Sequence, residues 1–175
     1  MELEALLRSE HSRRVTDEVV GWAGERPSLG KDRFGRVMKL VLGKDALLAQ
    51  RASAAIGPVA EQWPELVEPY LPRLVDCLGR ETLHVAVHRN ALRALQAFEI
   101  PEEIGGAVVD VCIRMLEDPT QPVALKAYSV TIFARLSRAH PELQQELKQL
   151  LKWSLRRKPT AALEVRARRA LAELD

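Results

Sequence analysis

A short turn sequence built around proline recurs along the chain at a nearly constant spacing. It reads Trp63-Pro64-Glu65-Leu66 and returns as His140-Pro141-Glu142-Leu143, with looser copies at Arg26-Pro27-Ser28-Leu29 and Ile100-Pro101-Glu102-Glu103. The prolines at 27, 64, 101 and 141 are therefore separated by 37, 37 and 40 residues. Helical sequence lies on both sides of each turn. A period of this length is typical of an α-solenoid, in which helical hairpins stack on one another.

Two ladders of residues repeat with the same period. Apolar side chains stand ten and fourteen residues after the prolines, one helical turn apart and so on one face of the helix: Val37, Leu74, Val111, Leu151, then Val41, Leu78, Met115 and Leu155. A cation recurs early in the first helix of each pair: Arg14, Arg51, Arg89, Lys126 and Arg166. We interpret these cations as structural, bonding to carbonyls or acids of the preceding repeat.

Helix boundaries follow from the breaks and from the capping residues. A short turn is predicted at 2–8, and Asp45 and Thr160 are suited to cap helices. The predicted first helices cover 11–25, 46–62, 84–98 and 122–139. The second helices cover 31–43, 69–79 after a loose turn at 65–68, 101–117 and 141–157, and a last helix covers 160–174. The expected organisation is one domain over 1–175, with repeats near 9–44, 45–80, 82–118 and 121–158 and a half repeat at 160–175.

Composition agrees with a folded helical protein. The chain is 47% hydrophobic and 29% charged, with only 5% aromatic residues, which suits helices packed on helices. No apolar run reaches the ~18 residues of a membrane span. The acidic N-terminus lacks the features of a signal peptide, so we expect a cytoplasmic protein. Cys77 and Cys112 lie in apolar helical segments, and we expect both to be buried, reduced thiols.

The chain resembles HEAT-like repeat proteins over nearly its whole length, and it is similar in size and layout to small bacterial members of that group. The resemblance rests on the Pro-Glu-Leu turns, on the segment Pro69-Tyr70-Leu71-Pro72-Arg73-Leu74 and on the basic residue early in each first helix. It implies an all-α fold, a right-handed α-α solenoid of about four and a half HEAT-like helical hairpins. In such a solenoid the second helix of each pair lines the concave side, where a partner is held.

Charged side chains repeat along the second helices, and the resemblance places them on that concave side. The predicted partner-binding residues are Arg36, Lys39, Arg73, Asp76, Asp110 and Arg114. Alternatively, they are ordinary surface charges that form some ion pairs between repeats. We expect a non-catalytic scaffold that binds a protein or peptide partner, needs no cofactor and exists as a monomer or weak dimer.

Basic residues gather toward the C-terminus, where residues 119–175 hold 11 basic and 5 acidic side chains. The basic patch comprises Lys148, Lys152, Arg156, Arg157, Lys158, Arg166, Arg168 and Arg169. It is either a solvated cap, a surface for an acidic protein, or a nucleic-acid surface. In the nucleic-acid alternative, the chain resembles the DNA alkylation repair glycosylases, which use a HEAT-like solenoid with aromatic side chains. Trp153 is the best candidate contact for this alternative.

Other candidate sites are weaker. His84 and His88 have the spacing of paired zinc ligands, but no Glu stands between them in the HExxH pattern and no third ligand is assignable. A polar face at a helix N-terminus explains them, so no metal is expected. Trp22 and Trp63 stand at or near repeat turns, which indicates packing. The sequence has no Ser-His-Asp set, phosphate loop or nucleotide fingerprint.

Overall fold

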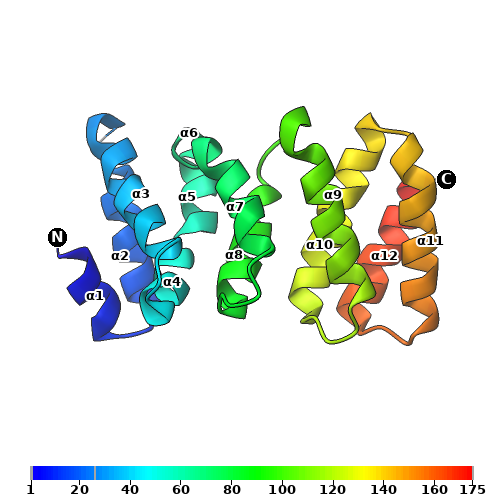
Figure 1. Cartoon of the computed structure of the whole chain (residues 1–175), viewed down its shortest axis with the longest axis horizontal. Coiled ribbons are helices and arrows are strands. Elements are labelled where there is room, and N and C mark those ends of the chain that lie inside the picture. The colour runs from blue at the N-terminus through cyan, green and yellow to red at the C-terminus, as the bar shows by residue number, and fades with distance from the viewer. Residues whose placement is uncertain (1, 26, 175) are drawn as a thin grey trace. The chain divides into compact units, whose positions relative to one another are not determined.

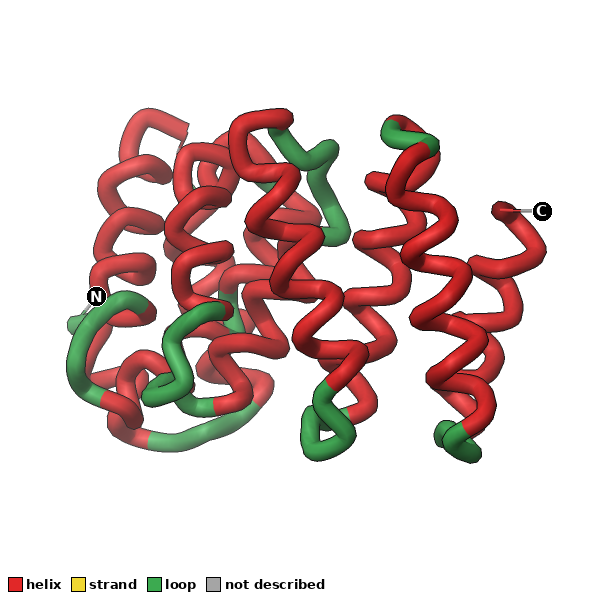
Figure 2. Tube along the Cα trace, turned by 45° about the vertical axis from the view of Figure 1, so that its right-hand side comes forward, coloured by secondary structure: helices red, strands yellow, loops and turns green. Residues whose placement is uncertain are grey.

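The computed structural model describes residues 2–25 and 27–174, and every regular element in those residues is a helix (Figures 1 and 2). The chain separates into two compact units, Met1–Phe98 and Glu99–Asp175. None of the described helices combines the length and apolar character needed to cross a membrane. The prediction of an all-α fold is thereby confirmed.

The first unit contains eight α-helices and one short 3-10 helix within the described residues. They are α1 Leu3–Ser9, α2 Arg13–Gly24, α3 Pro27–Val41, α4 Ala46–Ser53, α5 Ile56–Gln62, α6 Pro64–Val67, η1 Glu68–Tyr70, α7 Leu71–Leu78 and α8 Val85–Leu95.

Side-chain caps fix helix starts in this unit, and two of them use a side-chain oxygen. The Ser12 hydroxyl accepts a hydrogen bond from the Val15 amide at the start of α2, over 3.2 Å. The Asp45 carboxylate accepts one from the Leu48 amide at the start of α4, over 3.0 Å, which confirms the predicted cap. Each cap satisfies an amide that has no partner inside its helix.

The core of the first unit forms along the predicted apolar ladder. Val37 and Leu74 are fully buried, and α3 packs between α2 and α4. Trp63 is half-buried against Gly24. Its indole ring occupies the space that a side chain at position 24 would need, which supports the interpretation of Trp63 as a packing residue.

Two predicted boundaries in this unit are wrong. The helix expected at 46–62 is interrupted at Ala54 and Ala55 and forms α4 and α5. Pro58 explains the break, because proline has no amide hydrogen for the carbonyl of Ala54 and its ring clashes with that carbonyl. The helix expected at 31–43 instead begins at Pro27, since proline fits the first turn of a helix. Arg26, in the first predicted turn, lies outside the described residues.

The segment between Pro64 and Leu78 follows the prediction of a loose turn and then a helix. The single turn of α6 passes through η1 into α7, and Pro72 stands in the first turn of α7. Phe34 of α3 and Tyr70 of η1 meet edge to face with ring centroids 5.7 Å apart. This contact joins the start of α7 to α3.

The second unit consists of four described helices: α9 Glu102–Glu117, α10 Val123–Ala139, α11 Glu142–Arg156 and α12 Ala161–Leu174. The central helix is α10, which packs against the other three. Leu163 and Ala167 of α12 are buried, and Leu171 is half-buried. As expected from its apolar stripe, α12 folds back on α10 and α11.

The ladder of cations makes contacts between helices at two of its positions. Arg51 Nη1 donates to the carbonyl oxygen of Leu7 over 2.7 Å. Arg166 Nη1 donates to the carbonyl oxygen of Ala127 over 3.2 Å and to Thr131 Oγ1 over 3.0 Å. The interpretation is confirmed for Arg166, whose acceptors lie in the preceding repeat, whereas the acceptor of Arg51 lies in α1, before the first predicted repeat. Arg14 instead pairs with the acids at positions 10 and 18, over 2.8 and 3.4 Å.

Both cysteines are buried and free, as expected. Burial raises the pKa of the Cys77 thiol. Burial also raises the pKa of Cys112, to about 12, although the Ser129 hydroxyl beside it acts in the opposite direction. Thiols of this kind are poor nucleophiles at neutral pH, because the thiolate is the reactive form.

Candidate partner-binding surfaces

The six residues predicted to bind a partner are all exposed, and each lies on a second helix of its pair. Arg36 and Lys39 lie on α3, and Arg73 and Asp76 lie on α7, in the first unit. Phe34 of α3 contacts Tyr70, the residue before α7. Asp110 and Arg114 lie on α9, in the second unit.

The charged surface of α3 includes the ring of Trp22. The guanidinium carbons of Arg33 and Arg36 each lie 5.4 Å from its centroid. Arg33 also donates to the carbonyl oxygen of Trp22 over 2.9 Å and lies 3.5 Å from Glu25. Arg33 therefore makes its polar contacts within the protein. Arg36 keeps an exposed charge beside the Trp22 ring, and this cation–π contact is worth about 0.5–1 kcal/mol.

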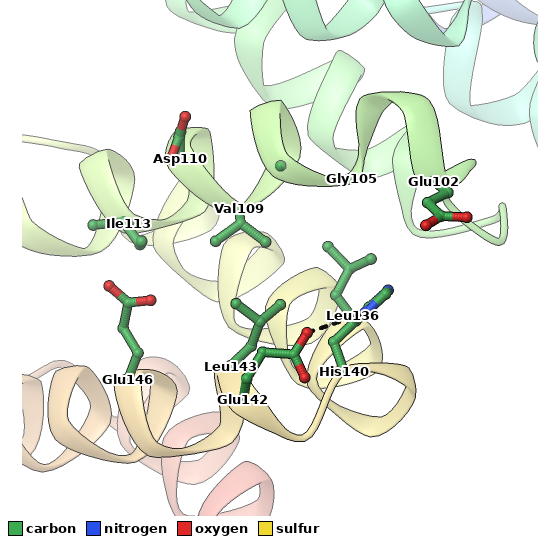
Figure 3. A pocket seen from close by; sticks show the side chains of 11 residues that line it. Glu102, Gly105, Val109, Asp110, Ile113, Leu136, His140, Glu142, Leu143 and Glu146 are labelled. Atoms are coloured by element: carbon green, nitrogen blue, oxygen red, sulfur yellow. Dashed lines mark ion pairs between the residues drawn. The ribbon is translucent and has the colours of Figure 1, made fainter.

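A groove of about 420 Å³ lies between α9 and α11, and the last turn of α10 and the residue after it also line it. We call it the α9–α11 groove. It has an apolar floor, made by Val109, Ile113, Leu136 and Leu143. Figure 3 shows Val109 of α9 and Leu143 of α11 pointing toward each other across it.

Two adjacent glycines of α9 keep this groove open. A Cβ atom added at Gly105 or at Gly106 would meet no atom within 4 Å outside the helix backbone. The space above them is therefore empty rather than filled by a neighbour. Glycine costs about 1 kcal/mol relative to alanine inside a helix, and no packing contact at these positions accounts for that cost.

The rim of the groove is acidic, with carboxylates at Glu102, Asp110, Glu142 and Glu146. The first turn of each helix holds Glu102 and Glu142, where an acid is stabilised by the helix dipole. Asp110 and Glu146 lie deeper in their helices, so the dipole does not account for them.

The rim has little countercharge. Glu142 has one basic neighbour in the groove, His140, whose Nδ1 lies 3.5 Å from Glu142 Oε1 and attracts it only when the imidazole is protonated. Among the described residues, Glu102, Asp110 and Glu146 form no ion pair. Glu142 and Glu146 also stand four residues apart on one helix, where like charges repel. The groove therefore concentrates uncompensated negative charge around an apolar floor.

The basic patch divides into two groups. On α12, Arg168 pairs with Glu164 over 2.8 Å and Arg169 with Glu173 over 3.1 Å. Arg169 and then Arg138 hold the pKa of Glu173 below its usual range. These two basic residues of α12 are therefore engaged within the protein.

The second group lies along α11 and at its C-terminal end, where Lys152, Arg156 and Arg157 are exposed. Lys152 and Arg156 share one stripe with Lys148, and Arg157 lies over Trp153, with its guanidinium carbon 4.2 Å from the ring centroid. Trp153 is 37% exposed, which is high for so large an aromatic side chain. At about 100° per residue, this basic stripe lies about a quarter turn around α11 from the acidic stripe of the groove.

His84 and His88 have structural roles. His84 precedes α8, and its Nδ1 accepts a hydrogen bond from the Ala86 amide over 3.1 Å. His88 is buried, with its Nε2 3.1 Å from the carbonyl oxygen of Arg80. His84 caps the N-terminus of α8, as the interpretation of a polar face predicted, whereas the ring of His88 is buried and contacts a loop carbonyl.

Sequence reasoning placed only one residue of the groove, Asp110, in a binding surface. Arg114, predicted beside it, does not line the groove. The missed acids and glycines did leave a signal in the sequence: the pair Gly105–Gly106 inside a helix, and like-charged glutamates four residues apart at 142 and 146. Neither pattern favours a stable helix.

A family model described as a HEAT repeat domain matches residues 3–174. The match covers nearly the whole chain, so the protein belongs to the HEAT repeat domain family. HEAT repeats are generally protein-interaction scaffolds, and proteins of this family are typically non-catalytic. No curated protein and no solved structure matches the chain.

Proposed function

We propose that this protein is a non-catalytic scaffold module that holds a protein or peptide partner on the exposed faces of its second helices. The observation that carries the proposal is the α9–α11 groove, which combines an open apolar floor with charges that have little compensation inside the protein. Membership of the HEAT repeat family supports the same conclusion.

The first unit adds a second surface of this kind. Arg36, Lys39, Arg73 and Asp76 are exposed on α3 and α7, and none of them forms an ion pair among the described residues. Exposed charges of this kind contribute little to folding. They are available to select a partner of complementary charge.

Partner capture tests the proposal. The immobilised protein is exposed to lysate, and the bound proteins are identified and quantified for wild type and for the Arg36→Glu, Arg73→Glu variant. We expect the variant to lose a specific partner. The matched control is Arg13→Glu with Arg89→Glu, two exposed arginines on first helices, which should retain it. Equal capture by all three proteins would contradict the proposal that the charges of α3 and α7 hold the partner.

A second candidate function, nucleic-acid binding, is favoured by the exposed Trp153 beside the cations of α11. Bases stack on aromatic side chains, and neighbouring cations contact phosphates. Fluorescence anisotropy with labelled single-stranded and duplex DNA and RNA tests it. Binding that persists at physiological salt and is lost in the Lys152→Glu, Arg156→Glu variant would support this function. Binding seen only at low salt would count against it.

A further inference from the structure

We infer that the α9–α11 groove binds a lysine- or arginine-rich peptide segment of another protein, anchored by one large apolar side chain. The inference rests on the proposed scaffold function and specifies the chemistry of its partner. It follows from three properties of the groove: the sign of its rim, the spacing of its acids and the shape of its floor.

The sign of the rim selects a cationic ligand. Four carboxylates surround the groove, and three of them have no ion-pair partner among the described residues. Screening at physiological ionic strength acts over about 8 Å, so a cation held inside the groove interacts strongly with the rim. Phosphate groups of nucleic acids and of anionic lipids would be repelled, which excludes both as ligands of this groove.

The spacing of the acids suits a peptide. Glu102 and Asp110 stand eight residues apart on α9, which is about 12 Å at 1.5 Å per residue. Glu142 and Glu146 on α11 are about 6 Å apart by the same rule. An extended peptide advances about 3.3 Å per residue, so side chains two to four positions apart reach consecutive acids. A peptide with several cations therefore matches the rim better than a single ion does.

The floor of the groove suits an apolar anchor. Its volume of about 420 Å³ lies toward the lower end of the range of about 300–1,000 Å³ found for ligand pockets. Val109, Ile113 and Leu143 offer an apolar contact to one or two side chains. Gly106 has no Cβ atom, so the peptide backbone can come close to α9 at that point.

Fluorescence anisotropy tests the inference with a labelled lysine-rich peptide that carries one central leucine, at physiological ionic strength. We expect saturable binding to wild type and at least tenfold weaker binding to Asp110→Asn with Glu146→Gln. Gly106→Leu gives a second test, because its side chain fills the groove. We expect this variant to lose binding while its melting temperature rises, a combination that unfolding cannot produce.

Matched controls separate the site from general electrostatics. Glu103→Gln removes an exposed acid of α9 that does not line the groove, and it should bind like wild type. The same peptide without leucine should bind more weakly, and a glutamate-rich peptide should not bind. No saturable binding by wild type, equal weakening in Glu103→Gln, or unchanged binding by Gly106→Leu would overturn the inference.

Two further results distinguish this inference from the scaffold proposal. If the lysine-rich peptide fails to bind, but a captured partner is still lost on Arg36→Glu with Arg73→Glu, the scaffold function stands and the inference fails. The basic stripe of α11 in a second copy is the competing occupant. If Asp110→Asn with Glu146→Gln abolishes self-association in sedimentation experiments without peptide, the second copy fills the groove and the inference is overturned.

Discussion

Gly24 lies where α2 packs against Trp63, and a methyl group added at this position would clash with the indole ring. A Cβ atom built on Gly24 would lie 2.3 Å from Cε3 of the Trp63 ring, a distance that real contacts do not reach. The indole ring is rigid, so the neighbour must move as a whole. Gly21, in the same helix, has no atom within 4 Å of its added Cβ.

These two glycines predict opposite effects of the same substitution. Gly24→Ala should lower the free energy of unfolding by about 1–3 kcal/mol, because it overpacks the contact with Trp63. Gly21→Ala should raise it by about 0.5–1 kcal/mol, because alanine favours the helix and nothing obstructs it. Chemical denaturation of both variants measures the difference. A stabilising Gly24→Ala would show that Trp63 moves aside without cost.

Asp45 couples the stability of the first unit to pH. A hydrogen bond from the Leu48 amide has the largest effect on this carboxyl, and Arg8, 2.5 Å away, adds to it. Both hold the pKa of Asp45 below its usual range. A group whose pKa is lowered by folding stabilises the protein above its ordinary value and loses that contribution as the pH falls through the folded value. The contribution of Asp45 should therefore fade below about pH 4.

Asp45→Asn isolates this effect, because asparagine also caps helices but carries no charge. We expect wild type to melt at a higher temperature than the variant at pH 7 and the gap to close as the pH falls below about 4. The control is Asp32→Asn, an exposed acid of α3 without an ion pair among the described residues. Its melting temperature at pH 7 should match that of wild type. A constant gap for Asp45→Asn would contradict the assignment.

At the scale of helices, most of the fold could be predicted from local rules. The cap at Asp45 and the two-step segment that ends in α7 follow from the chemistry of single residues. The break between α4 and α5 was not predicted, because Pro58 lies in an alanine-rich segment that favours a continuous helix. Its missing amide hydrogen and its clash with the preceding turn were enough to predict the break, so the signal was present in the sequence.

The binding site was much harder to predict than the helices. A period of 37 residues identifies which helices are second in their pairs, and the exposure of Arg36 and Arg73 agreed with it. The groove depends on how α9, α10 and α11 pack, which decides that Asp110 lines it together with Glu146 and that Arg114 does not. That outcome depends on the tertiary packing of α9 against α10 and α11, which no local pattern encodes.

The cations of the ladder differ in what they connect, which gives a prediction at this scale. Arg51 links α4 to α1, and Arg166 links α12 to α10, each by donating to a backbone carbonyl. Arg51→Met should lower the free energy of unfolding by about 1.5 kcal/mol, because a charge-assisted hydrogen bond is lost. Arg166→Met should cost less, because Arg166 is exposed.

Arg14 is the matched control for this series, since it holds the same position in its repeat but makes only exposed ion pairs. Arg14→Met should change the free energy of unfolding by less than about 0.5 kcal/mol. Urea denaturation ranks the three variants. If Arg14→Met proves as costly as Arg51→Met, the contact between helices is not what the ladder contributes.

At the scale of the whole molecule, the division into two compact units allows the stability of the chain to be described region by region. In repeat proteins, stability is close to a sum of repeat terms and nearest-neighbour terms. The second unit is built around α10, and α12 covers faces of both α10 and α11. Detaching α12 should therefore weaken the second unit and leave Met1–Phe98 largely unchanged.

Ala167→Asp tests this locality. Ala167 is fully buried, and a carboxylate there must lose its hydration without a partner, at a cost of about 3 kcal/mol. Amide hydrogen exchange should rise in α10, α11 and α12, with α2 and α3 unaffected. Ala172→Asp, at an exposed position of α12, should leave exchange unchanged. Faster exchange throughout both units of Ala167→Asp would mean that the chain unfolds as one cooperative block, and that α12 stabilises helices it does not touch.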